Sequence, residues 1–292
     1  MRLKRLIQKK TKKFIIKTLS NDLSTLFQAY NLSELNYCEI PYVKVKFKKK
    51  SILANKNEII NLKIDGQILP KILKTGTFDP FLFNFLKKKN LKNVIFIDVG
   101  ANHGLISKQV SNLKFVKKII TFEPFNKVYK LLEKNLRNNM NIKNYNYGWA
   151  NKNTKLSFFE NPANSGDLSL IANKQRKIKH ICKFKNCQHE LSRIIKQNKK
   201  YQFILKTDCQ GYDVEILNTL KNESLKKLSI YFLECKAIPK DKRETFYRKI
   251  SLFKKILVSC PLIHQDLRKI TPNMIGKYLS YKVEFDLILL NL

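Results

Sequence analysis

Long apolar runs and acidic residues are both scarce in this chain of 292 residues. No apolar run reaches the roughly 20 residues that a membrane-spanning helix needs, so we expect a chain that does not cross a bilayer. Only 22 residues are acidic against 58 basic ones, which gives a net charge of +36. Because 43% of the residues are hydrophobic, the chain can still build a sizeable core.

Arginine is also rare, since it supplies eight of the basic residues and lysine supplies the other 50. Proteins that bind phosphates and bases favour arginine, whose planar guanidinium binds bidentately. Abundant lysine, asparagine and isoleucine are typical of an AT-rich genome acting on tolerant surface positions. We therefore favour an ordinary solvated surface over a selected polyanion site, and we do not expect nucleic acid as the partner.

Cysteine is sparse and unpatterned, with six residues scattered along the chain. No secretory leader precedes them, so we expect a reduced, cytoplasmic environment. One group superficially offers four zinc ligands, namely His180, Cys182, Cys187 and His189. Its spacing is not that of a familiar zinc knuckle, so no metal is expected there.

The first 20 residues form a basic amphipathic pattern. Leu3, Ile7 and Phe14 fall near one helical face, and lysine and arginine largely fill the remainder. Such a helix either docks its apolar stripe on its own protein, which we favour, or lies on the anionic inner face of a membrane. No cleavage site of small residues follows, so we do not expect a signal peptide.

A small β cap is expected to follow this helix. Residues 42–48 alternate apolar and basic side chains, as a half-buried strand does. Residues 51–72 predict one or two more short strands, with Asp65-Gly66 as a turn. The chain then divides into an N-terminal α+β extension and a main domain, over residues 1–73 and 74–292.

Strands and helices alternate through the main domain. A helix is predicted from Pro80 to about Lys89, with Pro80 in its first turn and Asp79 as its N-cap. The alternation implies a mostly parallel, Rossmann-like sheet with helices on both faces. The expected strands are 94–99, 119–122, 144–150, 156–160, 203–207, 228–233 and 283–290, and the other expected helices are 104–112, 125–139 and 212–220.

Acidic residues stand at the ends of four of these strands: Asp98, Glu123, Asp208 and Glu234. In an open α/β sheet, ligands bind outside the carboxyl ends of the strands. Four acids in such positions are harder to attribute to chance than one, although loops are polar in any fold. The pattern predicts a ligand site at this edge.

The turn from Asp98 to Gly104 bears on the nature of the ligand. A dinucleotide needs G-x-G-x-x-G, whose middle glycine lets the backbone approach the pyrophosphate. Here Ala101 and Asn102 stand where the middle glycine would be, so the backbone has less conformational freedom. This argues against a nicotinamide oxidoreductase. It favours S-adenosylmethionine (SAM), which contains adenosine but no phosphate. Glu123 would accept hydrogen bonds from the ribose diol, Asp98 would hold the methionine ammonium directly or through water, and N–H groups near Gly104 would meet its carboxylate.

Three blocks in order resemble the FkbM family of SAM-dependent methyltransferases. They read Ile97-Asp-Val-Gly-Ala-Asn-His-Gly104, Phe122-Glu-Pro124 and Leu205-Lys-Thr-Asp-Cys-Gln-Gly-Tyr-Asp213. Gly76-Thr-Phe-Asp79 looks like the family's lead-in, and residues 164–169 look like its loop after the third strand. The resemblance covers about residues 74–240. It implies a class I methyltransferase fold with an antiparallel terminal strand, and O-methylation of a small molecule, sugar or glycan.

Pattern and resemblance together give the candidate site residues. Asp208 is the first candidate base, because a hydroxyl nucleophile must lose its proton as it attacks, although a helix N-cap or a cofactor contact would also suit it. Asp213 and His103 are weaker catalytic candidates, since they also suit a first-turn helix acid and a turn residue beside the methionine end. The cofactor-binding candidates are Thr77, Asp79, Asp98, Gly100, Asn102, Gly104, Glu123 and Pro124.

Departures from the family keep alternatives open. Its Leu-Asp pair before the helix that precedes the fourth main strand reads Cys187-Gln-His-Glu190 here, so no role is carried over from that Asp. Enzymes that methylate base amines typically carry Asp/Asn-Pro-Pro-aromatic after the fourth strand, whereas this chain has Asp208-Cys-Gln-Gly. Ribose methylation stays open, as does a lysine-rich binding protein without activity. The residues decide neither the acceptor, nor the oligomeric state, nor a need for a divalent metal.

Overall fold

The computed structural model describes residues 42–46, 51–53, 58–63, 68–160, 168–169, 178–235 and 237–292. The helix predicted over residues 1–20 and the turn predicted at Asp65-Gly66 lie outside the described residues, as does most of segment 164–169. Within the described ranges, no helix has both the length and the apolar character needed to cross a membrane.

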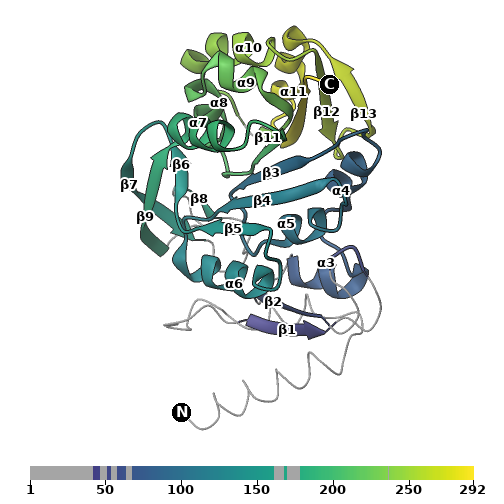
Figure 1. Ribbon diagram of the computed structural model, residues 1–292. Helices are drawn as coiled ribbons and strands as arrows, with labels where there is room; N and C mark the ends of the chain where they lie inside the picture. Colours follow the sequence, from purple (N-terminus) through teal and green to yellow (C-terminus); the bar gives the residue numbers. More distant parts are fainter. Residues whose placement is uncertain are drawn as a thin grey trace.

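An eight-stranded sheet forms the centre of the described structure (Figure 1). Its strands are β3 (Val94–Val99), β4 (Val116–Phe122), β5 (Ile142–Tyr145), β10 (Gln202–Thr207), β11 (Leu228–Cys235), β12 (Lys255–Cys260), β13 (His264–Ile270) and β14 (Phe285–Leu290). They lie in the order β13-β12-β14-β11-β10-β3-β4-β5. β5, β4, β3, β10 and β11 run parallel, and β14 runs antiparallel to β11. The predicted Rossmann-like sheet with an antiparallel terminal strand is confirmed.

Helices α4 (Pro80–Lys87) and α5 (Leu105–Val110) cover one face of this sheet. Side chains alternate between faces along a strand, so Phe96, Ile204 and Phe232 point to this side. The ring of Phe85 from α4 meets that of Phe232 edge-on, with 5.6 Å between centroids. This apolar layer packs on the same face of the sheet as the strand-end residues and directly precedes them along the strands.

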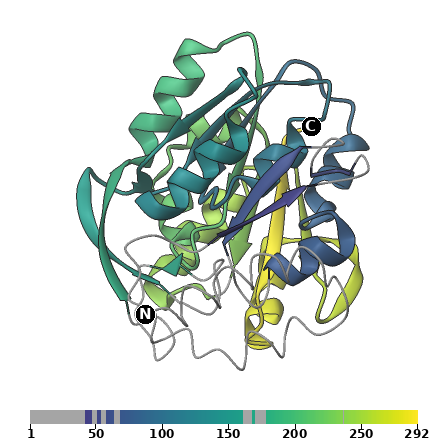
Figure 2. The same cartoon turned by 90° about the horizontal axis from the view of Figure 1, so that it is seen from below.

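The N-terminal elements pack against α5 and α6 (Asn126–Leu136), and Figure 2 shows them from below. They are β1 (Tyr42–Lys46), β2 (Ile59–Lys63) and α3 (Ile68–Thr75). Of the one or two strands predicted over residues 51–72, β2 is confirmed. The end of that range is a helix instead, because Ile68, Leu69 and Ile72 have helical spacing and bury one side with Leu105. The predicted domain boundary at residue 73 falls inside α3.

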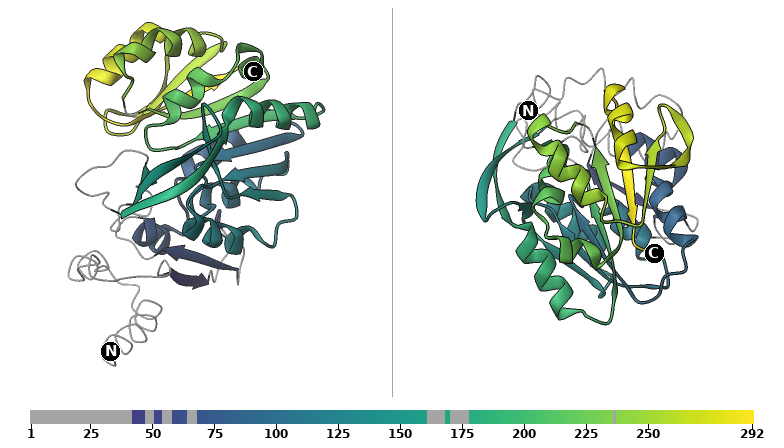
Figure 3. Two further views of the ribbon diagram at one scale, coloured as in Figure 1. Left: turned by 90° about the vertical axis from the view of Figure 1, so that its left-hand side faces the viewer. Right: turned by 90° about the horizontal axis from the view of Figure 1, so that it is seen from above.

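A second sheet stands beside the first, in the order β6-β9-β7-β8 (Figure 3). Its strands are β6 (Gly148–Ala150), β7 (Thr154–Glu160), β8 (Leu168–Ser169) and β9 (Ile178–Asn186). The single strand predicted over 144–150 is therefore wrong, since it splits between the two sheets. At the break, the Asn146 amide donates to the carbonyl oxygens of Glu123 and Pro124, at 2.9 and 3.4 Å, and ties the bend to the end of β4.

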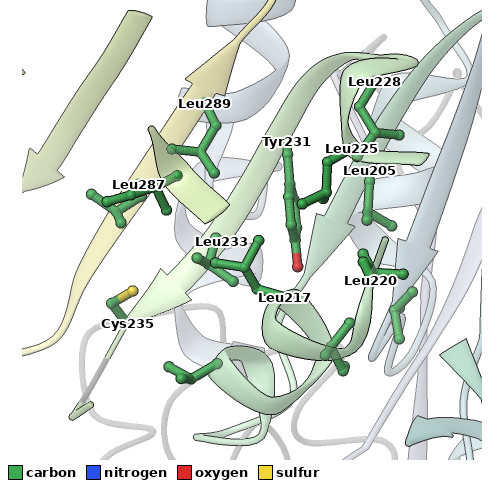
Figure 4. Close-up of a cluster of buried hydrophobic side chains, with 14 of the residues drawn as sticks. Leu205, Leu217, Leu220, Leu225, Leu228, Tyr231, Leu233, Cys235, Leu287 and Leu289 are labelled. Carbon is green, nitrogen blue, oxygen red and sulfur yellow. The ribbon is translucent and has the colours of Figure 1, made fainter. Parts of the chain in front are cut away.

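Five helices cover the opposite face of the large sheet within the described residues. They are α7 (Cys187–Gln197), α8 (Asp213–Thr219), α9 (Asn222–Lys226), α10 (Arg243–Ile250) and α11 (Ile275–Ser280). Figure 4 shows Tyr231 within this core, among Leu205, Leu217 and Leu233. The buried Tyr231 hydroxyl lies 3.2 Å from Thr207 Oγ1, so its polar end is satisfied inside the apolar layer.

The start of α4 departs from the prediction in one respect. The helix begins at Pro80, as expected, but Asp79 makes no side-chain cap and has a left-handed backbone with φ of 39°. The preceding segment is already fixed, because the Phe78 N–H donates to Gln109 Oε1 at 3.3 Å and the Gln109 amide donates to the Phe78 carbonyl. The chain therefore enters α4 with a fixed backbone and without a side-chain cap from Asp79.

Two glycines give a matched stability test. Gly100 has φ of +77°, and a Cβ added there would lie 2.0 Å from the Asp208 carbonyl oxygen, whereas one added at Gly276 would meet nothing within 4 Å. We expect Gly100→Ala to lower the free energy of unfolding by roughly 3 kcal/mol or more, through strain and clash. Gly276→Ala, inside α11, should change it by at most about 1 kcal/mol, in the stabilising direction. Urea unfolding checks both, and equal stabilities would contradict the backbone contact.

Candidate active site at the carboxyl ends of the parallel strands

A polar layer replaces the apolar one at the strand ends, on the face covered by α4 and α5. It is formed by Asp98 of β3, Lys206 of β10, Glu234 of β11 and Asp286 of β14. The strand register places Asp98 beside Lys206 and Glu234 beside Asp286. These side chains point the same way as apolar residues two positions along their strands, because side chains alternate. Two of the strand-end acids predicted from sequence, Asp98 and Glu234, therefore lie on the same face at the same end of the sheet.

Asp98 and Lys206 form a buried ion pair. Lys206 Nζ lies 3.2 Å from Asp98 Oδ1, and the Ser107 hydroxyl of α5 donates to Oδ2 at 2.7 Å. Burial lowers the pKa of Lys206, but the charges of Asp98 and Asp208 outweigh that effect and raise it above its ordinary value. Asp98 is 0% exposed, so in this conformation its carboxylate is closed to direct contact with a ligand.

The glycine turn is bonded onto β4 through its own N–H groups. Those of Gly100 and Ala101 donate to the Phe122 carbonyl at 3.0 and 3.1 Å, and that of Gly104 donates to the Ala101 carbonyl at 2.8 Å. The Asn102 N–H donates to Glu123 Oε2 at 3.0 Å. Four amides that a phosphate-binding loop would present to a ligand are thus engaged within the protein. These engaged amides fit the prediction, made from the missing middle glycine, that the turn does not bind a pyrophosphate.

Glu123 is a buried carboxylate at the end of β4, only 4% exposed. Besides the Asn102 N–H, it accepts the Phe125 N–H on Oε1 at 2.9 Å. Burial raises its pKa to about 7, although both N–H bonds act against the rise. Each carboxylate oxygen retains a second lone pair. The group can therefore accept two further hydrogen bonds, which suits a vicinal diol, and the buried Pro124 follows it directly.

Asp208 is an accessible carboxylate at the end of β10, with 40% of its side chain exposed. Lys206 Nζ lies 3.7 Å from its Oδ2, and the Gln210 amide donates to its Oδ1 at 3.0 Å. The same Gln210 nitrogen lies 3.5 Å from Glu234 Oε1. Lys206 therefore stands between the buried carboxylate of Asp98 and the open one of Asp208.

Asp213 and His103 are both 1% exposed. Asp213 accepts N–H bonds from Cys209 and Gly211, at 3.1 and 3.3 Å, and so closes the turn that carries Asp208. Burial and the charge of Asp208 raise the pKa of Asp213 to about 6. The backbone carbonyl of His103 accepts a hydrogen bond from Asn135 at 2.9 Å. Neither side chain is open to an acceptor in this conformation.

The lead-in segment before α4 reaches the same end of the sheet. The Thr77 hydroxyl donates to Gln109 Oε1 at 2.6 Å, which ties the segment to α5. Asp79 is exposed, and its charge is one of those that raise the pKa of Asp286 on β14. Thr77 thus holds the segment in place, and Asp79 contributes charge to the strand ends.

Sequence reasoning gave no role to four of these participants: Lys206, Ser107, Gln210 and Asp286. Ser107 and Gln210 follow the predicted turns and carry no pattern of their own. Asp286 did leave a signal, since it is the one charged residue in the apolar strand Phe285-Asp-Leu-Ile-Leu-Leu290. Such a residue on a central strand needs a polar environment.

The part of the chain that the structure describes contains no cluster of side chains suited to bind a metal ion. No three His, Cys, Asp or Glu side chains gather there to hold an ion. Of the superficial zinc set, Cys182 lies on β9 and packs with Phe125 and Phe184, while Cys187 begins α7 in the main core. The two thiols therefore belong to different apolar clusters.

Solved methyltransferase structures align with the chain at low identity. An FkbM methyltransferase from Methylobacillus flagellatus KT is 14% identical over 68% of this chain and 43% of its own, with a TM-score of 0.39. Precorrin-6y C5,15-methyltransferase from Geobacter metallireducens GS-15 is 10% identical over 84% and 91%, with a TM-score of 0.35. A human methyltransferase 10 domain containing protein is 11% identical over 74% and 84%, with a TM-score of 0.37. Likeness at this level says nothing of acceptor or activity.

Family membership rests on sequence. No curated protein matches the chain significantly. Residues 98–258, more than half of the chain, match the Methyltransferase FkbM domain. The match begins at Asp98 and includes the glycine turn, Glu123 and Asp208. The chain therefore belongs to the FkbM family of SAM-dependent methyltransferases.

Proposed function

We propose that this protein transfers the methyl group of SAM to a hydroxyl of a sugar, glycan or secondary metabolite. The observation that carries the proposal is the buried carboxylate of Glu123, held by two N–H groups beside a glycine turn whose amides are engaged. This arrangement suits an adenosine that carries a ribose diol and no phosphate.

The residues present fit this cofactor, which supplies an electrophilic methyl group when it is bound. Glu123 would accept the ribose hydroxyls, with Pro124 beside it. Gly100, Asn102 and Gly104 would shape the turn that meets the methionine end, and the buried charge of Asp98 would favour its ammonium. We assign Thr77 and Asp79 to the segment that covers this end of the sheet.

Asp208 is the carboxylate that we propose to meet the acceptor hydroxyl and its proton. With 40% of its side chain exposed it is open to an acceptor, and it follows β10, the strand next to β3 and its glycine turn. A hydroxyl becomes a better nucleophile as a nearby base takes its proton. Asp213 supports this role by fixing the turn.

Nucleic acid is the alternative acceptor that the net charge of +36 suggests. The charge near Asp208 points the other way, since Glu234 and Asp286 stand with it and Lys206 is already paired with Asp98. Carboxylates repel the phosphates on which nucleic-acid affinity depends. We therefore prefer an acceptor without phosphate next to the reacting hydroxyl.

Changing Glu123→Gln tests the cofactor site. We expect the Kd for SAM to rise about 10- to 100-fold, because a charged acceptor of two hydrogen bonds is lost. In the wild type, the affinity for SAM should rise between about pH 6 and about pH 8, as a carboxyl with a pKa of about 7 ionises. The variant should lack that rise.

Isothermal titration calorimetry measures both effects. Glu133→Gln, the same change at an exposed position of α6, is the matched control and should bind SAM as the wild type does. Equal affinity of the Glu123→Gln variant and the wild type would remove Glu123 from the cofactor site.

Transfer of labelled methyl from SAM tests the reaction itself. Against a panel of sugars, their single deoxy analogues and RNA, we expect label in a sugar and none in the analogue that lacks the reacting hydroxyl. Asp208→Asn should lower kcat about 100-fold while SAM still binds. Label in RNA and in no sugar would favour the alternative.

A further inference from the structure

Asp286 is a charged residue that the proposed site has not yet used. It lies on β14, beyond the residues that match the FkbM domain, and its strand is otherwise apolar. The register pairs it with Glu234 of β11, and side-chain alternation puts it on the same face as Lys206. It therefore belongs to the polar layer at the strand ends.

Its carboxylate differs from the others in having no donor. Among the described residues, no N–H or O–H donates a hydrogen bond to the side-chain carboxylate of Asp286, whereas that of Asp213 accepts backbone N–H groups and that of Asp208 accepts the Gln210 amide. A partly buried carboxylate without donors takes up a proton more readily than one that is hydrogen-bonded. Asp286 is thus the member of the layer best able to accept a proton.

The negative charges around Asp286 also favour its protonated form. Asp208 lies in the loop after β10, Asp79 precedes α4, Glu284 precedes β14 and Glu234 faces it from β11. Lys206 is the cation that opposes them. Burial first, and then the charges of Asp208 and Asp79, raise the pKa of Asp286 to about 7. A base works best when its pKa lies near the operating pH.

We propose that Asp286 is a further catalytic residue that shares the base role with Asp208. Asp208 contacts the acceptor hydroxyl, and the carboxylate of Asp286 finally accepts its proton. This inference rests on the proposed O-methyl transfer. The acceptor oxygen forms a bond to the methyl carbon with its own electron pair. The carbon–sulfur bond breaks with its pair going to sulfur, which leaves S-adenosylhomocysteine. The O–H bond breaks, Asp208 orients the hydroxyl, and the proton ends on the Asp286 carboxylate.

Carboxyl-carbon NMR of protein labelled at aspartate tests the proton site without cofactor or acceptor. We expect one carboxyl to titrate near pH 7 in the wild type, and its signal to be absent from Asp286→Asn. In Asp208→Asn the same titration should move to lower pH, because a neighbouring negative charge is gone. A signal near pH 7 that persists in Asp286→Asn, the lack of any such signal in the wild type, or a titration that Asp208→Asn leaves in place would overturn the proposal.

Kinetics with the sugar acceptor found in the labelling panel test the catalytic part. Asp286→Asn is nearly isosteric, and it should lower kcat about 100-fold with unchanged affinity for SAM and lose the rise in rate near pH 7. Asp241→Asn, at an exposed position before α10, is the control and should behave as the wild type does. A wild type that methylates no hydroxyl contradicts the proposed function. An active wild type with an equally active Asp286→Asn contradicts the inference alone.

Discussion

The buried ammonium group of Lys206 is the interaction on which the site depends. It pairs with Asp98, joins β10 to β3, and reaches toward Asp208 at the open end. Its charge also lowers the pKa values of Glu123 and Asp286, in opposition to their burial. Without this cation, carboxylates brought together from four strands would repel one another in a medium of low dielectric constant. The lysine therefore lets acidic residues gather where the donor and the acceptor are proposed to meet.

The glycine turn carries the other half of the account. Gly100 lets β3 pass against the backbone of Asp208, and the turn amides bond to β4 and to Glu123. These contacts bring together the ends of three strands that are distant in sequence. A turn bonded in this way presents a ligand with the carboxylate of Glu123 and a fixed backbone surface, and not with free amides. That difference separates this site from one that binds a pyrophosphate.

Local pattern predicted much of the fold, because a buried strand ending in an acid leaves a clear trace in sequence. Residues 94–99 are a strand with those bounds, and Asp98, Glu123, Asp208 and Glu234 do converge. The failures came from contacts that sequence does not display. Ile68 to Ile72 became helix because their apolar side packs on β2, and residues 144–150 split where Asn146 binds the end of β4.

The polar layer was likewise predictable only in part. The motif residues could be named from sequence, but their exposure could not, and exposure separates Asp208 from Asp213 and His103. Asp286 is far along the chain from the motifs, and only the antiparallel pairing of β14 with β11 brings it to the site. The single charge in an apolar strand marks Asp286 as unusual, but it does not tell which other residues lie beside it.

The choice of cofactor is the claim on which the rest of the account depends. Calorimetric titration of the wild-type protein with SAM and, separately, with NAD⁺ tests it most directly. The account predicts that one SAM binds per chain and that NAD⁺ does not bind. Binding of NAD⁺ with no binding of SAM would contradict it.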